Sequence, residues 1–185
     1  NERAAAEHEG LFYGWYVVGA LFFATFLVVG TRQAFGVFVE TWEGEWGVSV
    51  GRISVAASVG WLLNGLVQPF FGRIVDRVGG RPVVLISMTV MGVAFIGMAF
   101  VTNVWMLTVL YGVVISSAAG GISPSMTGVF VVRWFQRRRG TAMSVLVSGG
   151  SVGGLILLPF LTYLFLATNW QTAWVAAGVI SLLLG

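Results

Sequence analysis

The sequence predicts an all-α membrane protein whose six helices cross the bilayer, and three observations predict this class. Only 9% of the 185 residues are charged, whereas 57% are hydrophobic; soluble domains carry about 25% charged residues. Long stretches without charge have the length that a membrane span needs. The arginines gather between these stretches and favour one side. These features exclude a soluble enzyme, a disordered protein and a nucleic-acid-binding domain.

The uncharged stretches define the predicted spans in order. Stretches 10–31 and 53–72 each suit one helix, since about 20 apolar residues cross the hydrocarbon core. Stretches 82–132 and 140–185 are too long for one crossing, and each contains a Thr-Asn pair that divides it in two. The pairs are Thr102-Asn103 and Thr168-Asn169, and the predicted spans are 14–39, 51–76, 82–101, 104–133, 140–167 and 170–185.

Arginine placement predicts the topology. The chain has no Lys, so all 10 basic residues are Arg. The positive-inside rule makes the arginine-rich side cytoplasmic, which places the N-terminus there, in a plasma or inner membrane. The opposite side has Arg52 beside three glutamates. The arginines of the cytoplasmic side are Arg3, Arg73, Arg77, Arg81, Arg133, Arg137, Arg138 and Arg139.

Both ends of the chain indicate a piece of a longer protein. The last predicted span, 170–185, would be about 24 Å long, less than the roughly 30 Å hydrocarbon core. The first residue is Asn1 rather than Met. We therefore expect a cytoplasmic tail at 1–13 and a transmembrane domain at 14–185.

Two residue types mark surfaces of the predicted spans. Small residues let membrane helices approach closely, so the GxxxG pairs Gly149/Gly153 and Gly150/Gly154 and the small-residue cluster 116–121 predict helix interfaces. Tryptophans at span ends favour the headgroup level, so those at the outer ends predict an interfacial belt rather than a stacking site. These are Trp42, Trp46, Trp105 and Trp170.

The segment 72–81, Gly-Arg-Ile-Val-Asp-Arg-Val-Gly-Gly-Arg, connects the second and third spans. It resembles the signature loop of the major facilitator superfamily: Gly, three residues, Asp-Arg, one residue, Gly, one residue and a basic residue. Other segments resemble the monocarboxylate transporter and oxalate/formate antiporter branch. They are Tyr13-Gly14-Trp15, Phe35-Gly36-Val37-Phe38, and Arg133-Trp134-Phe135 followed by Arg137-Arg138-Arg139-Gly140.

This resemblance implies the N-terminal six-helix half of a twelve-helix major facilitator fold, with the C-terminal half missing. It also implies two three-helix repeats of inverted topology, at about 14–103 and 104–185. One departure is Asn169-Trp170-Gln171, where the branch usually has Gly-Trp-Arg.

The resemblance gives the signature loop a mechanical role. It implies that Asp76 bonds the loop arginines and the N-terminal end of a helix in the missing half, where a carboxylate is favourable. Made in one state only, this contact would latch the transporter. The alternative is a plain role in topology and capping. The gating residues are Gly72, Asp76, Arg77, Gly79, Arg81 and Arg133.

Arg32 is a charge placed deep in a predicted span, about 12 Å of helix from Glu40 at the outer end. A charge at mid-bilayer costs about 2.5–3.5 kcal/mol on insertion scales and faces the bundle interior or an aqueous cavity. We expect Arg32 to bind a carboxylate. The alternatives are snorkelling to the headgroups or a structural bond to helix carbonyls. Gln33 occupies the position that carries a functional Lys in many animal monocarboxylate transporters.

The same ungapped count places five further residues on the cavity face of the family. For the apolar members, ordinary packing is an equally good interpretation. They are Gly60 and Asn64 in the second span, and Met143, Val147 and Gly150 on one face of the fifth.

The predicted function is secondary active transport of small organic anions, mono- or dicarboxylates, by alternating access. The expected partners are the anion, the lipid bilayer and the missing half, with no cofactor, no metal and no nucleic acid. An enzyme is not expected, because the chain has no Cys and its single His is His8 in the tail. Two alternatives stay open: a transporter of the same fold for another solute, and a six-span channel or assembly subunit.

Overall fold

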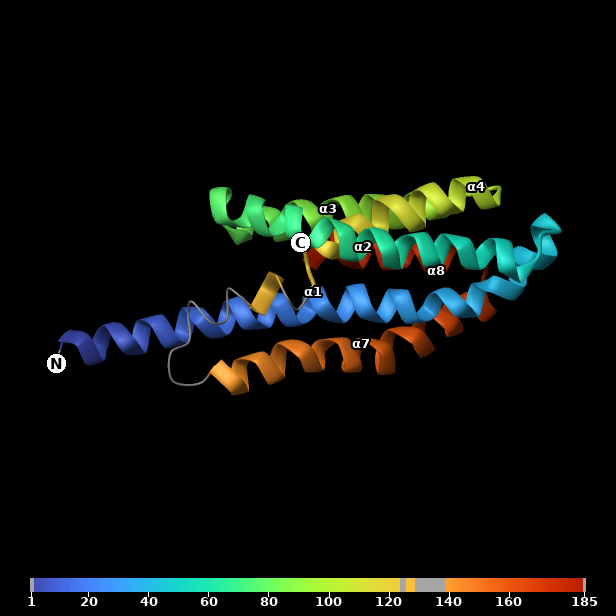
Figure 1. Cartoon of the computed structure of the whole chain (residues 1–185). Coiled ribbons are helices and arrows are strands. Elements are labelled where there is room, and N and C mark those ends of the chain that lie inside the picture. The colour runs from blue at the N-terminus through green and yellow to red at the C-terminus, as the bar shows by residue number, and fades with distance from the viewer. Residues whose placement is uncertain (1, 124–125, 129–138, 185) are drawn as a thin grey trace.

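The computed structural model describes residues 2–123, 126–128 and 139–184, and these are helical apart from short connections (Figure 1). Among the described residues, the first part of the fourth predicted span, 104–120, consists of three consecutive segments, of which the middle one, η1, is a π-helix. The helices are α1 (Glu2–Trp46), α2 (Val50–Val78), α3 (Gly80–Met98), α4 (Val104–Leu107), η1 (Thr108–Ile115), α5 (Ser116–Gly120), α7 (Arg139–Ala167) and α8 (Trp170–Leu184).

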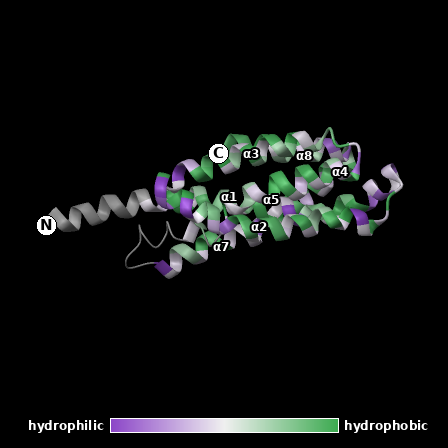
Figure 2. Cartoon of the chain, turned by 45° about the horizontal axis from the view of Figure 1, so that its top comes forward, coloured by the Kyte–Doolittle hydropathy of each residue, from purple (hydrophilic) through white to green (hydrophobic). Residues whose placement is uncertain are grey.

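The described helices confirm the predicted class, an all-α polytopic membrane architecture. Four of them are long and apolar enough to cross a membrane: Gly14–Trp46, Val50–Val78, Gly80–Met98 and Arg139–Ala167. Two shorter apolar helices occupy the fourth and sixth predicted positions, at Val104–Gly120 and Trp170–Leu184. Figure 2 shows hydrophobic residues along the helices and hydrophilic segments gathered toward the two ends of the bundle.

The predicted breaks at the two Thr-Asn pairs are confirmed, and each asparagine caps the next helix. The Asn103 side chain accepts a hydrogen bond from the Met106 backbone N–H at 2.9 Å. The Asn169 side chain accepts bonds from the Thr172 N–H at 2.9 Å and from its hydroxyl at 2.7 Å. Such caps satisfy backbone donors at a helix start and are worth about 1 kcal/mol.

The first helix is longer than predicted at both ends. It begins at Glu2, so residues 2–13 of the expected tail are helical, as their run of alanines and glutamates favours. It ends at Trp46 rather than at residue 39, because Gly47 adopts φ +60° and donates its N–H to the Glu43 carbonyl at 3.0 Å. A glycine in the left-handed region is a common helix stop.

The closest packing joins α1 with α7, α2 with η1 and α5, and α3 with α8. Figure 1 shows α7 running beside α1. A Cβ atom on Gly149 would lie 2.6 Å from the Phe22 carbonyl oxygen, and one on Gly120 would lie 2.6 Å from Val67 of α2. Gly178 approaches the backbone of α3 in the same way. The glycine clusters therefore mark helix interfaces, as predicted.

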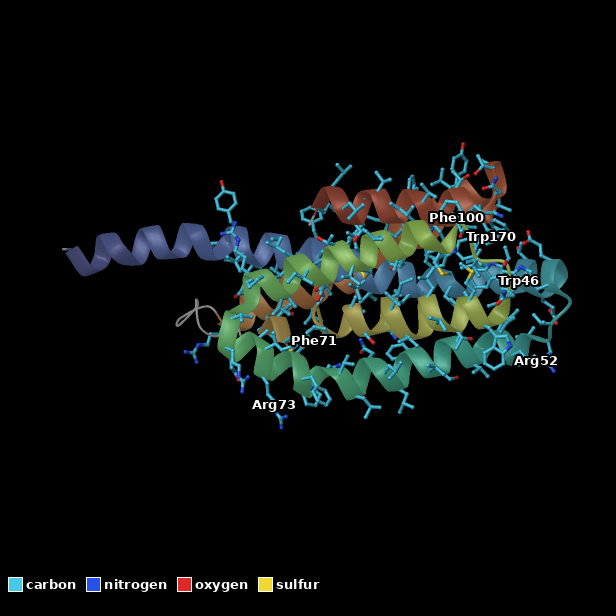
Figure 3. All side chains as sticks on the ribbon, turned by 90° about the horizontal axis from the view of Figure 1, so that it is seen from above. Trp46, Arg52, Phe71, Arg73, Phe100 and Trp170 are labelled. Carbon is cyan, nitrogen blue, oxygen red and sulfur yellow. The ribbon has the colours of Figure 1, made fainter. Side chains whose placement is uncertain are left out.

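The predicted tryptophan belt is wrong for two of its members. Trp42 is fully buried, and its ring stacks on Trp46 with centroids 5.8 Å apart. Trp170 is also buried and donates its indole N–H to the Glu45 carboxylate at 2.9 Å; Trp46 and Trp170 lie close together in Figure 3. These rings bury apolar area between α1 and α8 instead of facing the headgroups. Trp105 is 83% exposed, as a belt residue would be.

Candidate functional site

Arg32 lies near the middle of the apolar part of α1 and is half-buried. Its guanidinium carbon lies 4.0 Å from the centroid of the Trp61 ring of α2, inside the roughly 6 Å range of a cation–π contact. Trp61 itself is 67% exposed, so the pair lies at an open surface of the described helices. A stacked guanidinium differs from a snorkelling one, which would extend along its own helix toward the headgroups.

Tyr111 of η1 is the second partner of Arg32. The guanidinium lies near the Tyr111 hydroxyl, and the tyrosine is 4% exposed. The tyrosine ring lies against Phe35 of α1 with centroids 4.3 Å apart, and against Trp174 of α8 at 6.1 Å. Residues from three predicted spans, the first, second and fourth, therefore meet at one cation.

The π-helical segment positions Tyr111. The Ser116 hydroxyl donates to the Tyr111 carbonyl at 2.9 Å, and the Ser116 backbone N–H bonds the same oxygen. This five-residue step is the π-helical pattern, which is rare and occurs often at functional sites. Since the extra residue per turn changes which side chains face α1, the segment sets the direction in which Tyr111 points.

Gln33, the neighbour of Arg32, is exposed and faces α7. Its side-chain amide fills the space that a Cβ atom on Gly154 would occupy, so the two residues are in direct contact. Gly154 belongs to the second GxxxG pair, and its missing side chain makes room for this polar group. Gln33 therefore lies at the edge of the α1–α7 contact.

Gly60 and Asn64, expected on the cavity face, lie in the contact between α2 and α5. A Cβ atom on Gly60 would strike the Ser116 hydroxyl. The Asn64 amide donates to the Ser116 carbonyl at 3.0 Å, and its oxygen accepts from Gln68 at 3.4 Å. Both residues are buried, because the Ser116 carbonyl accepts from the amide and the small glycine leaves room for the serine side chain.

The three expected cavity residues of α7 have different surroundings. Gly150 is buried, and a Cβ atom there would lie 3.1 Å from Val29 of α1. Met143 is half-buried, and its methyl carbon lies 3.0 Å from the Cβ position of Gly128. Val147 is 49% exposed. The predicted shared face thus divides into one packing residue, one partly packed residue and one open residue.

The signature loop forms a one-residue connection between α2 and α3. Gly79 adopts φ +84° and ψ 167° and donates its N–H to the Val75 carbonyl at 2.9 Å. Only glycine adopts this conformation without strain, which explains the glycine at this position of the motif. A Cβ atom on Gly72 would lie 3.6 Å from Met126. The exposed charged residues of the loop are Arg73, Asp76, Arg77 and Arg81; Arg133, Arg137 and Arg138 lie outside the described residues.

The model of the Major Facilitator Superfamily matches residues 21–185. The chain belongs to the major facilitator superfamily. One relative is Monocarboxylate transporter 14 of Homo sapiens, which is 28% identical to this chain. The match covers 92% of the chain and 33% of the relative's length. Monocarboxylate transporter 9 of Gallus gallus is 31% identical over 76% of the chain and 28% of the relative. An uncharacterized MFS-type transporter of Bacillus subtilis (strain 168) is 25% identical over 90% of the chain and 41% of the relative.

Family and relatives identify a multi-pass membrane transporter chain. The chain spans between 28% and 41% of the length of these three relatives. The names of the relatives denote transporters rather than enzymes. Among the described residues, no group of three or more His, Cys, Asp or Glu side chains could hold a metal ion.

Sequence reasoning missed Trp61 and Tyr111, the two aromatic partners of Arg32. Trp61 lies at the centre of the uncharged stretch 53–72, far from the ends where belt residues are found. That position is the signal that could have singled it out. No such signal exists for Tyr111, because its contact with Arg32 depends on the π-helix and on packing between residues far apart in the chain.

Proposed function

We propose that this chain is the N-terminal six-helix half of a twelve-helix secondary transporter that moves small organic anions, mono- or dicarboxylates, across a plasma or inner membrane by alternating access. No chemical step is part of this function. The names of the animal relatives and the chain's share of their length support the proposal. The N-terminus would be cytoplasmic; Figure 3 places Arg73 and Arg52 at opposite ends of the bundle, as this orientation requires.

Arg32 is the single observation that carries the anion specificity. A guanidinium in mid-bilayer is expensive unless it faces a cavity or a partner. Here two rings hold it beside an open surface, and neither Trp61 nor Tyr111 is an anion. The site therefore keeps its positive charge, and a substrate carboxylate is the group that would neutralise it, bidentately where geometry allows.

Helix pairing supports the division into two inverted three-helix repeats, 14–103 and 104–185. In such a duplication the first, second and third spans correspond to the fourth, fifth and sixth. The first span packs on the fifth, the second on the fourth, and the third on the sixth. Exchanging corresponding spans reproduces the same set of pairs, as the symmetry requires.

The signature loop is proposed as a gate. Asp76 would latch one state by bonding loop arginines and a helix N-terminus of the other half. Gly79 supports this role because its unusual backbone brings α2 and α3 together with a one-residue connection. Asp76→Asn should then insert and fold normally but transport slowly; an unchanged rate in proteoliposomes would contradict the gate.

Counterflow in proteoliposomes tests the proposed function on the full-length protein. Vesicles loaded with unlabelled anion are offered labelled formate, oxalate, lactate or pyruvate. Wild type should exchange at least one of them, Arg32→Gln should lose that exchange, and Arg52→Gln in the first turn of α2 should retain it. Exchange in Arg32→Gln at the wild-type rate contradicts the role of Arg32. No exchange of any of the four by wild type favours the same fold acting on another solute.

A further inference from the structure

Trp61 lies far from the span ends, where the aromatic residues of a membrane belt are found. It lies in the middle of α2, is 67% exposed, and yet contacts a cation on another helix at 4.0 Å. A tryptophan that only faced lipid at this depth would have apolar neighbours. The position of Trp61 is therefore explained by its contact with Arg32 rather than by a contact with lipid.

The geometry of a guanidinium explains how one residue can serve both an indole and an anion. A guanidinium that stacks on a ring uses its flat face and leaves its five N–H groups available. A carboxylate approaches in the plane of the cation, along the N–H edge. The Arg32 guanidinium carbon lies 4.0 Å from the Trp61 ring centroid, which is a stacking distance, and Tyr111 lies near the same cation. The face and the N–H edge of a guanidinium are separate surfaces, so stacking on Trp61 leaves N–H groups for an anion.

We infer that Trp61 is a positioning residue for the anion: its ring holds the Arg32 guanidinium in one orientation and leaves N–H groups available to the substrate carboxylate. This rests on the proposed function of Arg32. A long arginine side chain has many rotamers, and a substrate that must order it binds more weakly. The stacked ring orders the cation before the anion arrives. Trp61 acts through Arg32, and its loss weakens binding without blocking the transport cycle.

The test is the counterflow kinetics of the full-length protein with whichever of formate, oxalate, lactate or pyruvate it exchanges. Trp61→Leu should raise KM about tenfold, the order of a cation–π contact in a partly desolvated site, with Vmax within about twofold of wild type. Trp61→Phe keeps an aromatic face and should recover most of the affinity. Trp61→Met is about as large as Trp61→Leu and also lacks an aromatic face, so the two should behave alike; recovery in Trp61→Phe alone then shows that the aromatic face matters.

Trp105→Leu is the matched control, because Trp105 is an exposed tryptophan at the start of α4, at an outer span end. Its KM should equal that of wild type. An unchanged KM in Trp61→Leu, or an equal rise in Trp61→Phe and Trp61→Leu, overturns the inference. If Arg32→Gln loses exchange while the Trp61 variants behave as wild type, only the inference fails. If Arg32→Gln exchanges as wild type does, or wild type exchanges none of the four anions, the proposed function and the inference fail together.

Discussion

The α1–α7 pair and the pair formed by α2 with η1 and α5 use the same close approach but differ in chemistry. In the first, Gly153 lies directly against the Phe26 carbonyl, glycine on backbone. In the second, the Asn64 amide bonds the Ser116 carbonyl at 3.0 Å, and the Ser116 hydroxyl bonds the Tyr111 carbonyl at 2.9 Å. The first pair is a packing contact, whereas the second is a polar connection that continues to Arg32 through Tyr111.

This difference teaches where function concentrates in a bundle of similar helices. Lipid provides no hydrophobic force between spans, so small-residue packing is available to every pair. Polar groups are costly in the membrane unless they are paired. In the contact of α2 with η1 and α5, the hydrogen-bonded polar groups lie around one segment, η1. The same segment presents Tyr111 to the candidate anion site.

The largest expected effect is on the packing contact. A Cβ atom on Gly153 would collide with the backbone oxygen of Phe26, which cannot move without shifting α1. Gly153→Ala should lower the free energy of unfolding by about 1–3 kcal/mol, measured by an unfolding titration in detergent. Gly36→Ala is the matched control in α1, because nothing lies within 4 Å of its Cβ position. Equal stability of the two variants would contradict the packing account.

A smaller loss of stability is expected in the polar pair. A Cβ atom on Gly60 would meet the Ser116 hydroxyl, a side-chain group that can rotate away. Gly60→Ala should therefore cost about 1 kcal/mol or less. Rotation of the hydroxyl breaks its bond to the Tyr111 carbonyl, so KM for the transported anion should rise. If Gly60→Ala loses as much stability as Gly153→Ala and leaves KM unchanged, the contact of α2 with η1 and α5 is a packing contact like that of α1 with α7.

The smallest expected effect comes from Asn64. Asn64→Ala removes its bond to Ser116, and hydrogen bonds between membrane helices average about 0.6 kcal/mol. The unfolding titration should show a loss of this order. Asn64→Asp in the same assay is the sharper variant, because it replaces the amide donor with a charge inside the bundle. An unchanged stability for both would show that this bond contributes nothing to the pair.

Much of the fold could be predicted from the sequence because membrane spans follow local rules. The uncharged stretches located the helices, and Asn103 and Asn169 broke them where they cap the next helix. The GxxxG pairs indicated the face of α7 that packs on α1. Gly79 shows the same locality, since one residue with φ +84° accounts for a motif glycine.

The site was less predictable because it depends on contacts between distant spans. Arg32 was identified by its depth alone, but its partners were not. The count that placed Gly60 and Asn64 on the cavity face did not anticipate the π-helix or the contacts of both residues with Ser116 at its end. The buried Trp42 and Trp170 likewise depended on how closely α1 and α8 meet, a tertiary property.

The most direct test of the central claim, that Arg32 binds the substrate anion, is anion-dependent thermal stabilisation of the purified full-length protein. A ligand that binds only the folded state raises Tm, and the rise grows with the logarithm of the ratio of ligand concentration to Kd. The transported anion should raise the Tm of wild type and of Arg52→Gln, and it should leave the Tm of Arg32→Gln unchanged. An equal rise of Tm in Arg32→Gln would contradict the account.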